Sequence, residues 1–232
     1  MTSSQSALIV AHGSPADPAP HEAALQALAQ AVNALMPGWT VRGATLAAPG
    51  ALEAALSCLD APLIYPFFMA EGWFTGREHP RRLRVSGAET ARQVSPFGVD
   101  PALPDLMARV ATEGARAAGM DPVTATLVLA AHGSKISRTS SDSTTAMARA
   151  LSTRTTFKKI TCGFVEEAPF LTDAACGLGP AVCLPFFALR AGHVLDDVPK
   201  ALAEAGFDGP LLPEIGAHPD VPSLICAALL RG

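Results

Sequence analysis

Apolar residues occur in short bounded runs along the chain, and the same arrangement appears twice. The run over 7–11 ends in His12-Gly13-Ser14, and the run over 125–131 ends in His132-Gly133-Ser134. The two histidines are 120 residues apart in a chain of 232. Short apolar runs closed by a turn sequence are typical of buried parallel strands. The pattern therefore predicts two similar halves, each beginning with a buried strand.

Other segments repeat at nearly the same distance and alternate between strand and helix patterns. The repeated segments are 43–49 with 163–169, 63–68 with 182–187, and 98–106 with 216–224. Apolar residues at helical spacing predict a helix over 23–35. The remaining elements of the prediction are strands at 40–45, 62–67 and 125–131, and helices at 50–58, 104–118, 140–152 and 221–230.

The order strand, helix, strand predicts an α/β fold in which helices cover both faces of a parallel sheet. Because the pattern is duplicated, we expect two similar three-layer lobes with flavodoxin-like or Rossmann-like topology. The lobes are predicted at 1–118 and 119–232, with 119–122 as the linker. In this scheme the helix over 104–118 closes the first lobe, and the helix over 221–230 closes the second.

Composition narrows the class of protein. Hydrophobic residues make up 49% and charged residues 16%, which is typical of a globular core and not of disorder. A net charge of −4 argues against nucleic acids or anionic membranes as general partners. With no signal-like leader and no membrane-span pattern, we expect a cytoplasmic protein. Its five cysteines include no Cys-x-x-Cys pair, so we expect reduced, buried thiols.

The halves differ in residues that can carry chemistry. In parallel sheets of this kind, ligands bind beyond the carboxyl ends of the strands, where both histidines fall. Alignment of Gly72 with Gly192 sets Trp73 against His193. Alignment of Gly43 with Gly163 sets Leu46 against Glu166. The second half alone thus combines His132, Glu166 and His193 at predicted strand ends.

Two imidazoles and a carboxylate suit a divalent cation such as Co²⁺, Fe²⁺, Ni²⁺ or Zn²⁺. The same groups accept protons near neutral pH. Gly133 permits a tight turn, and Ser134 can cap a following helix or hydrogen-bond the imidazole. For each of these side chains a structural role is the alternative.

Several short motifs stand at or after the predicted strand ends: His-Gly-Ser after the first strand, Phe164-Val165-Glu166, and the Pro-Phe-Phe, Gly-His-Val and Asp-Val-Pro motifs within 185–199. In these motifs the chain resembles the sirohydrochlorin chelatases of the cobalamin and siroheme pathways, the small metal-inserting class II chelatases, in their long duplicated form. The resemblance covers essentially the whole chain. It implies that His132 and His193 bind the metal and act as bases, and that Glu166 assists them. His12 is the matching residue of the first half, but it lacks its partner because Trp73 stands in the place of His193. We therefore expect the site of the first half to be degenerate.

The implied reaction is ATP-independent insertion of a divalent metal into sirohydrochlorin, a polycarboxylated tetrapyrrole. Co²⁺ is the first choice of metal, with Fe²⁺ or Ni²⁺ as alternatives, and neither a nucleotide nor an organic cofactor is expected. Substrate contacts are assigned to the residues near the proposed cleft, and the protein is expected to be a monomer or homodimer. These substrate-contacting residues are Ser134, Lys135, Arg138, Arg190, His12 and Trp73.

Two rival functions remain open. A carrier of tetrapyrrole or metal would use the same residues without turnover. A histidine-nucleophile phosphatase also has His-Gly after its first strand, but that chemistry needs arginine before the histidine, where Ala11 and Ala131 stand. The sequence contains no P-loop pattern, no complete dinucleotide-binding glycine motif and no Gly-x-Ser-x-Gly.

Overall fold

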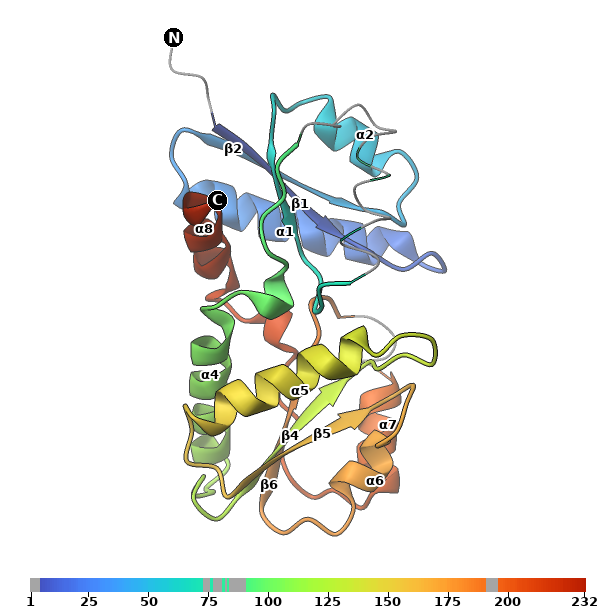
Figure 1. Cartoon of the computed structure of the whole chain (residues 1–232), viewed down its shortest axis with the longest axis vertical. Coiled ribbons are helices and arrows are strands. Elements are labelled where there is room, and N and C mark those ends of the chain that lie inside the picture. Colours follow the sequence, from blue (N-terminus) through green and yellow to red (C-terminus); the bar gives the residue numbers. More distant parts are fainter. Residues whose placement is uncertain (1–4, 73–75, 77–80, 82, 84–90, 191–195) are drawn as a thin grey trace. The chain divides into compact units, whose positions relative to one another are not determined.

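The chain folds into two compact units, each built on a three-stranded parallel sheet (Figure 1). The computed structural model describes residues 5–72, 76, 81, 83, 91–190 and 196–232. The first unit comprises Met1–Asp100 with Pro219–Gly232, and the second comprises Pro101–His218. The predicted α/β class and the duplication are both confirmed.

The sheet of the first unit has the order β2-β1-β3. Helices α1 and α8 pack together on one face, and α2 covers the other with an apolar cluster that includes Leu8, Val10 and Leu52. The helix predicted over 23–35 starts earlier, at Pro18, because proline fits the first turn of a helix, where no intrahelical N–H bond is needed. The elements of this unit are β1 (Gln5–Ala11), α1 (Pro18–Leu35), β2 (Trp39–Thr45), α2 (Ala51–Leu56), β3 (Leu63–Pro66), the 3-10 turn η2 (Phe97–Val99) and α8 (Val221–Arg231).

The second unit repeats this plan with the order β5-β4-β6. Helices α4 and α5 cover one face, and α6 and α7 cover the other with a cluster that includes Val128, Leu171 and Leu202. The elements of this unit are α4 (Leu103–Ala117), β4 (Thr126–Ala131), α5 (Thr139–Ser152), β5 (Lys159–Phe164), α6 (Leu171–Ala175), β6 (Ala181–Pro185), α7 (Val198–Glu204) and the 3-10 turn η4 (Ile215–Ala217).

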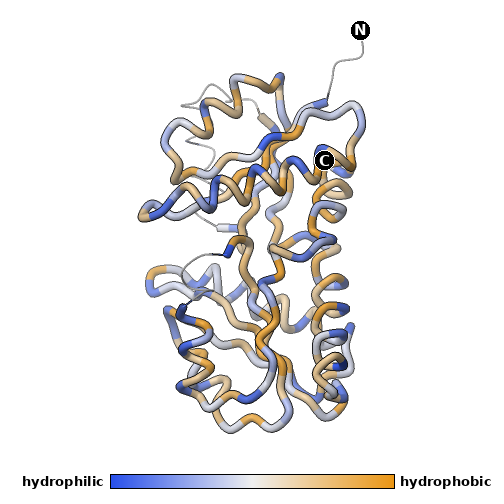
Figure 2. The backbone as a smooth tube through the Cα atoms, turned by 180° about the vertical axis from the view of Figure 1, so that it is seen from behind, coloured by the Kyte–Doolittle hydropathy of each residue, from blue (hydrophilic) through white to orange (hydrophobic). Residues whose placement is uncertain are grey.

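The central strand of each sheet is buried on both faces, as the apolar runs predict. Ala7 to Ala11 of β1 and Thr126 to Ala131 of β4 are all buried. Figure 2 shows hydrophobic residues along the strands and mixed hydropathy along the helices. Helices that pack one face on a sheet need this mixture, because their outer face meets water. Among the described residues, no helix is both long and apolar enough to span a bilayer.

Two helices are exchanged relative to the expected lobes. We expected the helix over 104–118 to close the first lobe, but α4 packs on α5 and β6 of the second unit. Helix α8, expected in the second lobe, packs on α1 and β3 of the first. The two halves offer similar sheet faces and similar amphipathic helices, so the hydrophobic pattern alone does not specify which helix covers which sheet.

The unit boundaries change accordingly. The chain passes between units after Asp100 and after His218, in place of the boundary expected near residue 118. The segment 119–122, predicted as a linker, joins α4 to β4 inside the second unit. Gly119 has a φ of 75° and donates its N–H to the carbonyl oxygen of Arg116. This left-handed glycine with its hydrogen bond is a common way to end a helix. A glycine with these properties ends a helix equally well inside a domain or between two.

The five cysteines are all free thiols, as expected, but they are not all buried. Cys183 lies in the core, whereas Cys58 and Cys176 are exposed. Burial raises the pKa of Cys162 to about 11 and the pKa of Cys183 to about 12, so both stay protonated at neutral pH.

Tyr65 carries a buried hydroxyl with no hydrogen-bond partner in the described part of the chain. Burial, with the nearby charge of Asp100, raises the pKa of this phenol well above its ordinary value. Ile9 pairs with Tyr65, and Leu129 pairs with Leu184, so the second unit has leucine at the matching place.

We therefore expect Tyr65→Phe to raise the free energy of unfolding by about 1 kcal/mol, because a buried hydroxyl without a partner costs stability. Urea unfolding of the two proteins at pH 7 measures this difference. A stability below that of the wild type would mean that the hydroxyl has a partner in the native protein.

Candidate functional site

His132 follows β4 directly, at the carboxyl end of the central strand of the second sheet. Its side chain is exposed, and its Nδ1 lies 2.8 Å from the carbonyl oxygen of Gly133. A carbonyl oxygen only accepts, so Nδ1 carries the proton that is donated. In the neutral imidazole the lone pair is then on Nε2, the arrangement that metal-binding histidines use.

The turn after His132 depends on Gly133. This residue has a φ of 73°, a region that side chains other than glycine rarely adopt. A Cβ there would lie 2.9 Å from Cβ of Phe164 and 2.9 Å from Cγ of Glu167. Ser140, in the first turn of α5, accepts the Gly133 N–H through its Oγ at 3.2 Å. The glycine therefore lets β5 and its loop approach the histidine closely.

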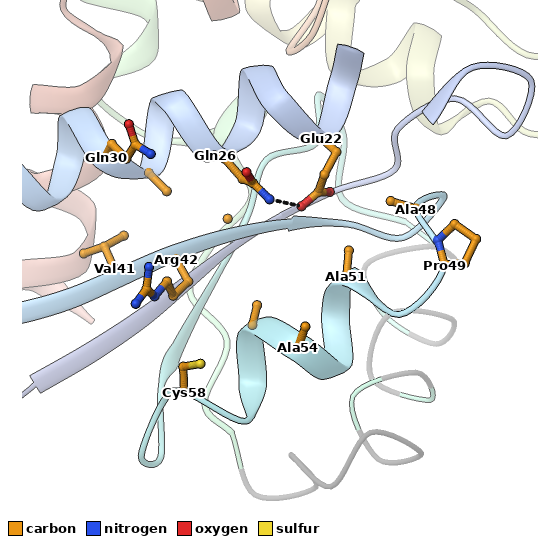
Figure 3. A pocket seen from close by; sticks show the side chains of 13 residues that line it. Glu22, Gln26, Gln30, Val41, Arg42, Ala48, Pro49, Ala51, Ala54 and Cys58 are labelled. Atoms are coloured by element: carbon orange, nitrogen blue, oxygen red, sulfur yellow. Dashed lines mark hydrogen bonds between the residues drawn. The ribbon is translucent and has the colours of Figure 1, made fainter. Parts of the chain in front are cut away.

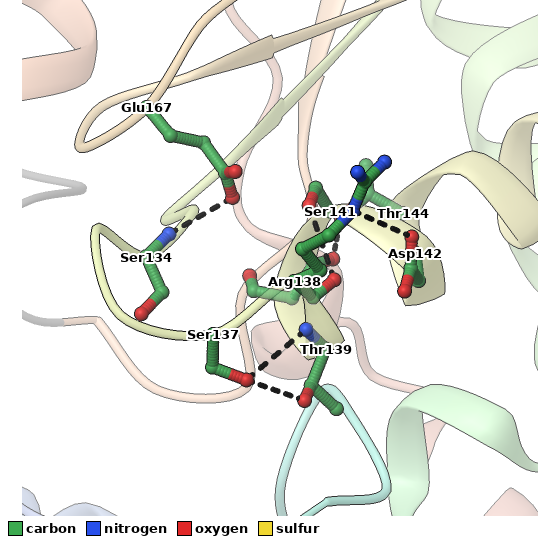
Figure 4. A network of polar contacts seen from close by, with 9 residues as sticks. Ser134, Ser137, Arg138, Thr139, Ser141, Asp142, Thr144 and Glu167 are labelled. Carbon is green, nitrogen blue, oxygen red and sulfur yellow. Dashed lines mark hydrogen bonds and ion pairs between the residues drawn. The ribbon is translucent and has the colours of Figure 1, made fainter.

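Glu167 fixes the next residue of this turn. Its Oε1 accepts the N–H of Ser134 at 2.9 Å, as Figure 4 shows. The Oγ of Ser134 accepts the N–H of Ile136 at 3.3 Å. In these contacts the serine stabilises its own loop, and the predicted helix cap is not formed, since α5 begins after Arg138 without a side-chain cap. Glu167 was not predicted as a site residue; the signal for it was only its place beside Glu166.

A backbone hydrogen bond holds Glu166 next to His132. Its N–H donates to the carbonyl oxygen of His132 at 2.9 Å. Its Oε2 lies 3.0 Å from Nζ of Lys135, so the two residues form an ion pair. The structure thus brings together four of the predicted residues, namely His132, Ser134, Lys135 and Glu166, on the loops that follow β4 and β5.

The sequence alignment that set Leu46 against Glu166 is wrong by one residue, as the strand register shows. Ala11 pairs with Thr45, whereas Ala131 pairs with Phe164, so β5 follows β2 by 119 residues and not by 120. The N–H of Ala47 donates to His12, as that of Glu166 does to His132. Ala47, not Leu46, therefore occupies the position of Glu166.

The glycines explain the slip of one residue. Gly43 faces α1, because a Cβ there would meet the backbone of Leu25, while Gly163 faces α6, where it would meet Leu171. Successive residues of a strand point to opposite faces, so equating these glycines shifts the match by one. The first half still lacks a carboxylate at this position, because alanine replaces it.

The remaining predicted residues are spread more widely. Arg138 is exposed and lies 4.0 Å from Asp142 (Figure 4), and Arg190 is exposed beyond the end of β6. His12 follows β1 in the first unit, where it occupies the place of His132. Both His193 and Trp73 lie outside the described residues. Within the part of the chain that the structure describes, no group of three or more His, Cys, Asp or Glu side chains is arranged to hold a metal ion.

The first unit contains a cavity of about 500 Å³, and none of the predicted site residues is among the described residues that line it. It lies between α1, β2 and α2 (Figure 3). Glu22, in its wall, accepts hydrogen bonds from Gln26 at 2.9 Å and from the N–H of Thr45 at 2.7 Å. Its other walls are mostly alanine, with Gln30, Arg42 and Cys58 at the rim.

Comparison with known proteins gives a consistent result. The model of the CbiX family matches residues 126–231, and no curated protein matches the sequence. Among solved structures, CbiX, the terminal enzyme for biosynthesis of siroheme in denitrifying bacteria, is 47% identical, with a TM-score of 0.90, over 98% of this chain and 99% of that one.

Two more distant structures share the fold. SirB from Bacillus subtilis with Fe³⁺ is 18% identical with a TM-score of 0.74, and the match covers 98% of this chain and 94% of that one. The sirohydrochlorin chelatase SirB from Bacillus subtilis subspecies spizizenii, in complex with cobalt, is 16% identical with a TM-score of 0.67 over the same shares. Since the identity of 47% extends over nearly all of both chains, the protein belongs to the CbiX family of sirohydrochlorin chelatases.

Proposed function

We propose that the protein inserts a divalent metal into sirohydrochlorin without ATP, with Co²⁺ as the first choice and Fe²⁺ or Ni²⁺ as alternatives. The observation that carries the proposal is the identity of 47% with the siroheme enzyme CbiX over the whole chain. Structures of the same fold hold Fe³⁺ or cobalt, which supports a site that accepts more than one transition metal. The product would serve siroheme or cobalamin synthesis.

In this proposal His132 and His193 hold the incoming metal. The hydrogen bond from Nδ1 of His132 to Gly133 keeps the ring oriented, and Nε2 is the atom that we assign to the metal. Metal insertion releases the two pyrrole N–H protons, which need acceptors close to the metal. Glu166, whose backbone is joined to that of His132, is suited to this role.

The substrate is a polyanion, so its carboxylates need positive partners. Lys135, Arg138 and Arg190 supply charge in the second unit, and Ser134 adds a hydroxyl. We assign His12 and Trp73 of the first half to contacts with the macrocycle, because an indole can stack on a flat ring. The working form is a monomer or homodimer in the cytoplasm, a compartment in keeping with five free thiols.

Turnover separates this function from a carrier. We expect purified protein, mixed with excess sirohydrochlorin and Co²⁺, to form metallated product well beyond one equivalent and faster than the uncatalysed reaction. The change in the visible spectrum measures the rate, and parallel runs with Fe²⁺ under nitrogen and with Ni²⁺ rank the metals. A carrier would instead bind one equivalent and leave the background rate unchanged.

A further inference from the structure

The ion pair joins Lys135 and Glu166, two residues to which the proposed function assigns substrate binding and proton transfer. The two charged atoms are 3.0 Å apart, and the side chain of Lys135 is 75% exposed while that of Glu166 is 32% exposed. The ammonium is therefore open to solvent from most directions. An anion that enters the site would meet Lys135 while Glu166 is still bound to it.

The backbone on both sides of this pair is held in place. Glu167 accepts the N–H of Ser134, next to Lys135, and the N–H of Glu166 donates to His132. Movement is thus left to the two side chains. An ion pair this exposed contributes little to stability, and the lysine stem is flexible, so exchanging one carboxylate for another costs little.

We propose that Lys135 is a positioning residue that changes its ion-pair partner when the substrate binds. This proposal rests on the proposed function. In the free protein its ammonium holds the carboxylate of Glu166. A carboxylate of the tetrapyrrole takes that ammonium, so that Glu166, to which the proposed function assigns a pyrrole proton, no longer shares Lys135. Substrate binding and the availability of the base are then coupled through one ion pair.

The proposal predicts an unusual effect of Glu166→Gln. Because the substrate no longer competes with Glu166 for Lys135, this variant should bind metal-free sirohydrochlorin about two- to fivefold more tightly than the wild type, the range expected for an exposed ion pair. In the Lys135→Met background the same substitution should gain no more affinity than the loss of one negative charge elsewhere on the surface gives. Titration of sirohydrochlorin absorbance with protein, in the presence of a chelator, measures all four affinities.

Matched variants separate this coupling from simple repulsion. Removing any negative charge weakens repulsion of a polyanion, so Glu204→Gln, an exposed glutamate at the end of α7, is the control for Glu166→Gln. Lys159→Met, at the opposite end of β5, is the control for Lys135→Met. In steady state, Lys135→Met should raise KM for sirohydrochlorin several-fold and change kcat less than about twofold, and Lys135→Arg should restore KM.

The results of these titrations and assays distinguish a failure of the partner exchange from a failure of the proposed chelatase function. If Glu166→Gln gains affinity equally in the Lys135→Met background, or gains none in the wild type, the exchange of partners is wrong while the chelatase function stands. If the wild type neither binds sirohydrochlorin nor accelerates metal insertion, the proposed function itself fails.

Discussion

Replacing His132 with alanine is expected to slow metal insertion by about 100-fold or more, while the fold stays intact. The imidazole is exposed, and its bond to Gly133 joins neighbouring residues, so its loss removes little packing. Its loss does remove the metal ligand that we assign to β4. The spectral assay with Co²⁺ gives the rate, and circular dichroism with thermal unfolding verifies the fold.

The duplication supplies a matched control for this experiment. His12 follows β1 as His132 follows β4, and the backbone carbonyl of each accepts an N–H from the neighbouring loop. Near His12, however, that N–H belongs to Ala47 instead of a glutamate. We expect His12→Ala to keep most of the activity and His193→Ala to lose it as His132→Ala does. Equal losses at His12 and His132 would contradict a degenerate first half.

Most of the fold could be predicted because the pattern of buried strands is strong. The apolar runs before His12 and His132 are shorter than most buried helices, and they are typical of the central strands of a sheet that is covered on both faces. The exchange of α4 and α8 could not be predicted, since both helices have an apolar face that suits either sheet. Which helix packs on which sheet depends on tertiary contacts, and the spacing of apolar residues along the chain does not show these contacts.

The candidate site could be predicted in part. The residue types at the ends of β4 and β5 pointed to His132 and Glu166, and the structure brings their backbones together. The ion pair of Glu166 with Lys135 and the support from Glu167 depend on how two loops fold against each other. The register between β2 and β5 could not be predicted from the sequence either. Gly43 and Gly163 stand one residue apart in the two strands, so aligning them gave a plausible match that was shifted by one residue.

A second large effect is expected at Gly216, in η4 of the second unit. A Cβ at this residue would overlap the carbonyl oxygen of Ala188, and the N–H of Gly216 donates to the carbonyl oxygen of Phe187 at 3.0 Å. Both contacts are with backbone, which cannot move aside as a flexible side chain can. We expect Gly216→Ala to lower the free energy of unfolding by about 3 kcal/mol, the cost of forcing an atom into a packed place.

The first unit repeats this contact, which makes the prediction testable twice. Gly98 of η2 approaches the backbone of Met69 in the same way, and its N–H donates to Phe68. Gly98→Ala should therefore be destabilising to a similar degree, whereas Gly179→Ala, where a Cβ meets nothing within 4 Å, should change stability little. Urea unfolding compares the three variants. If Gly216→Ala is as stable as Gly179→Ala, the loop after β6 can yield at Ala188, and the close approach does not hold the segment that leads to Arg190 in place.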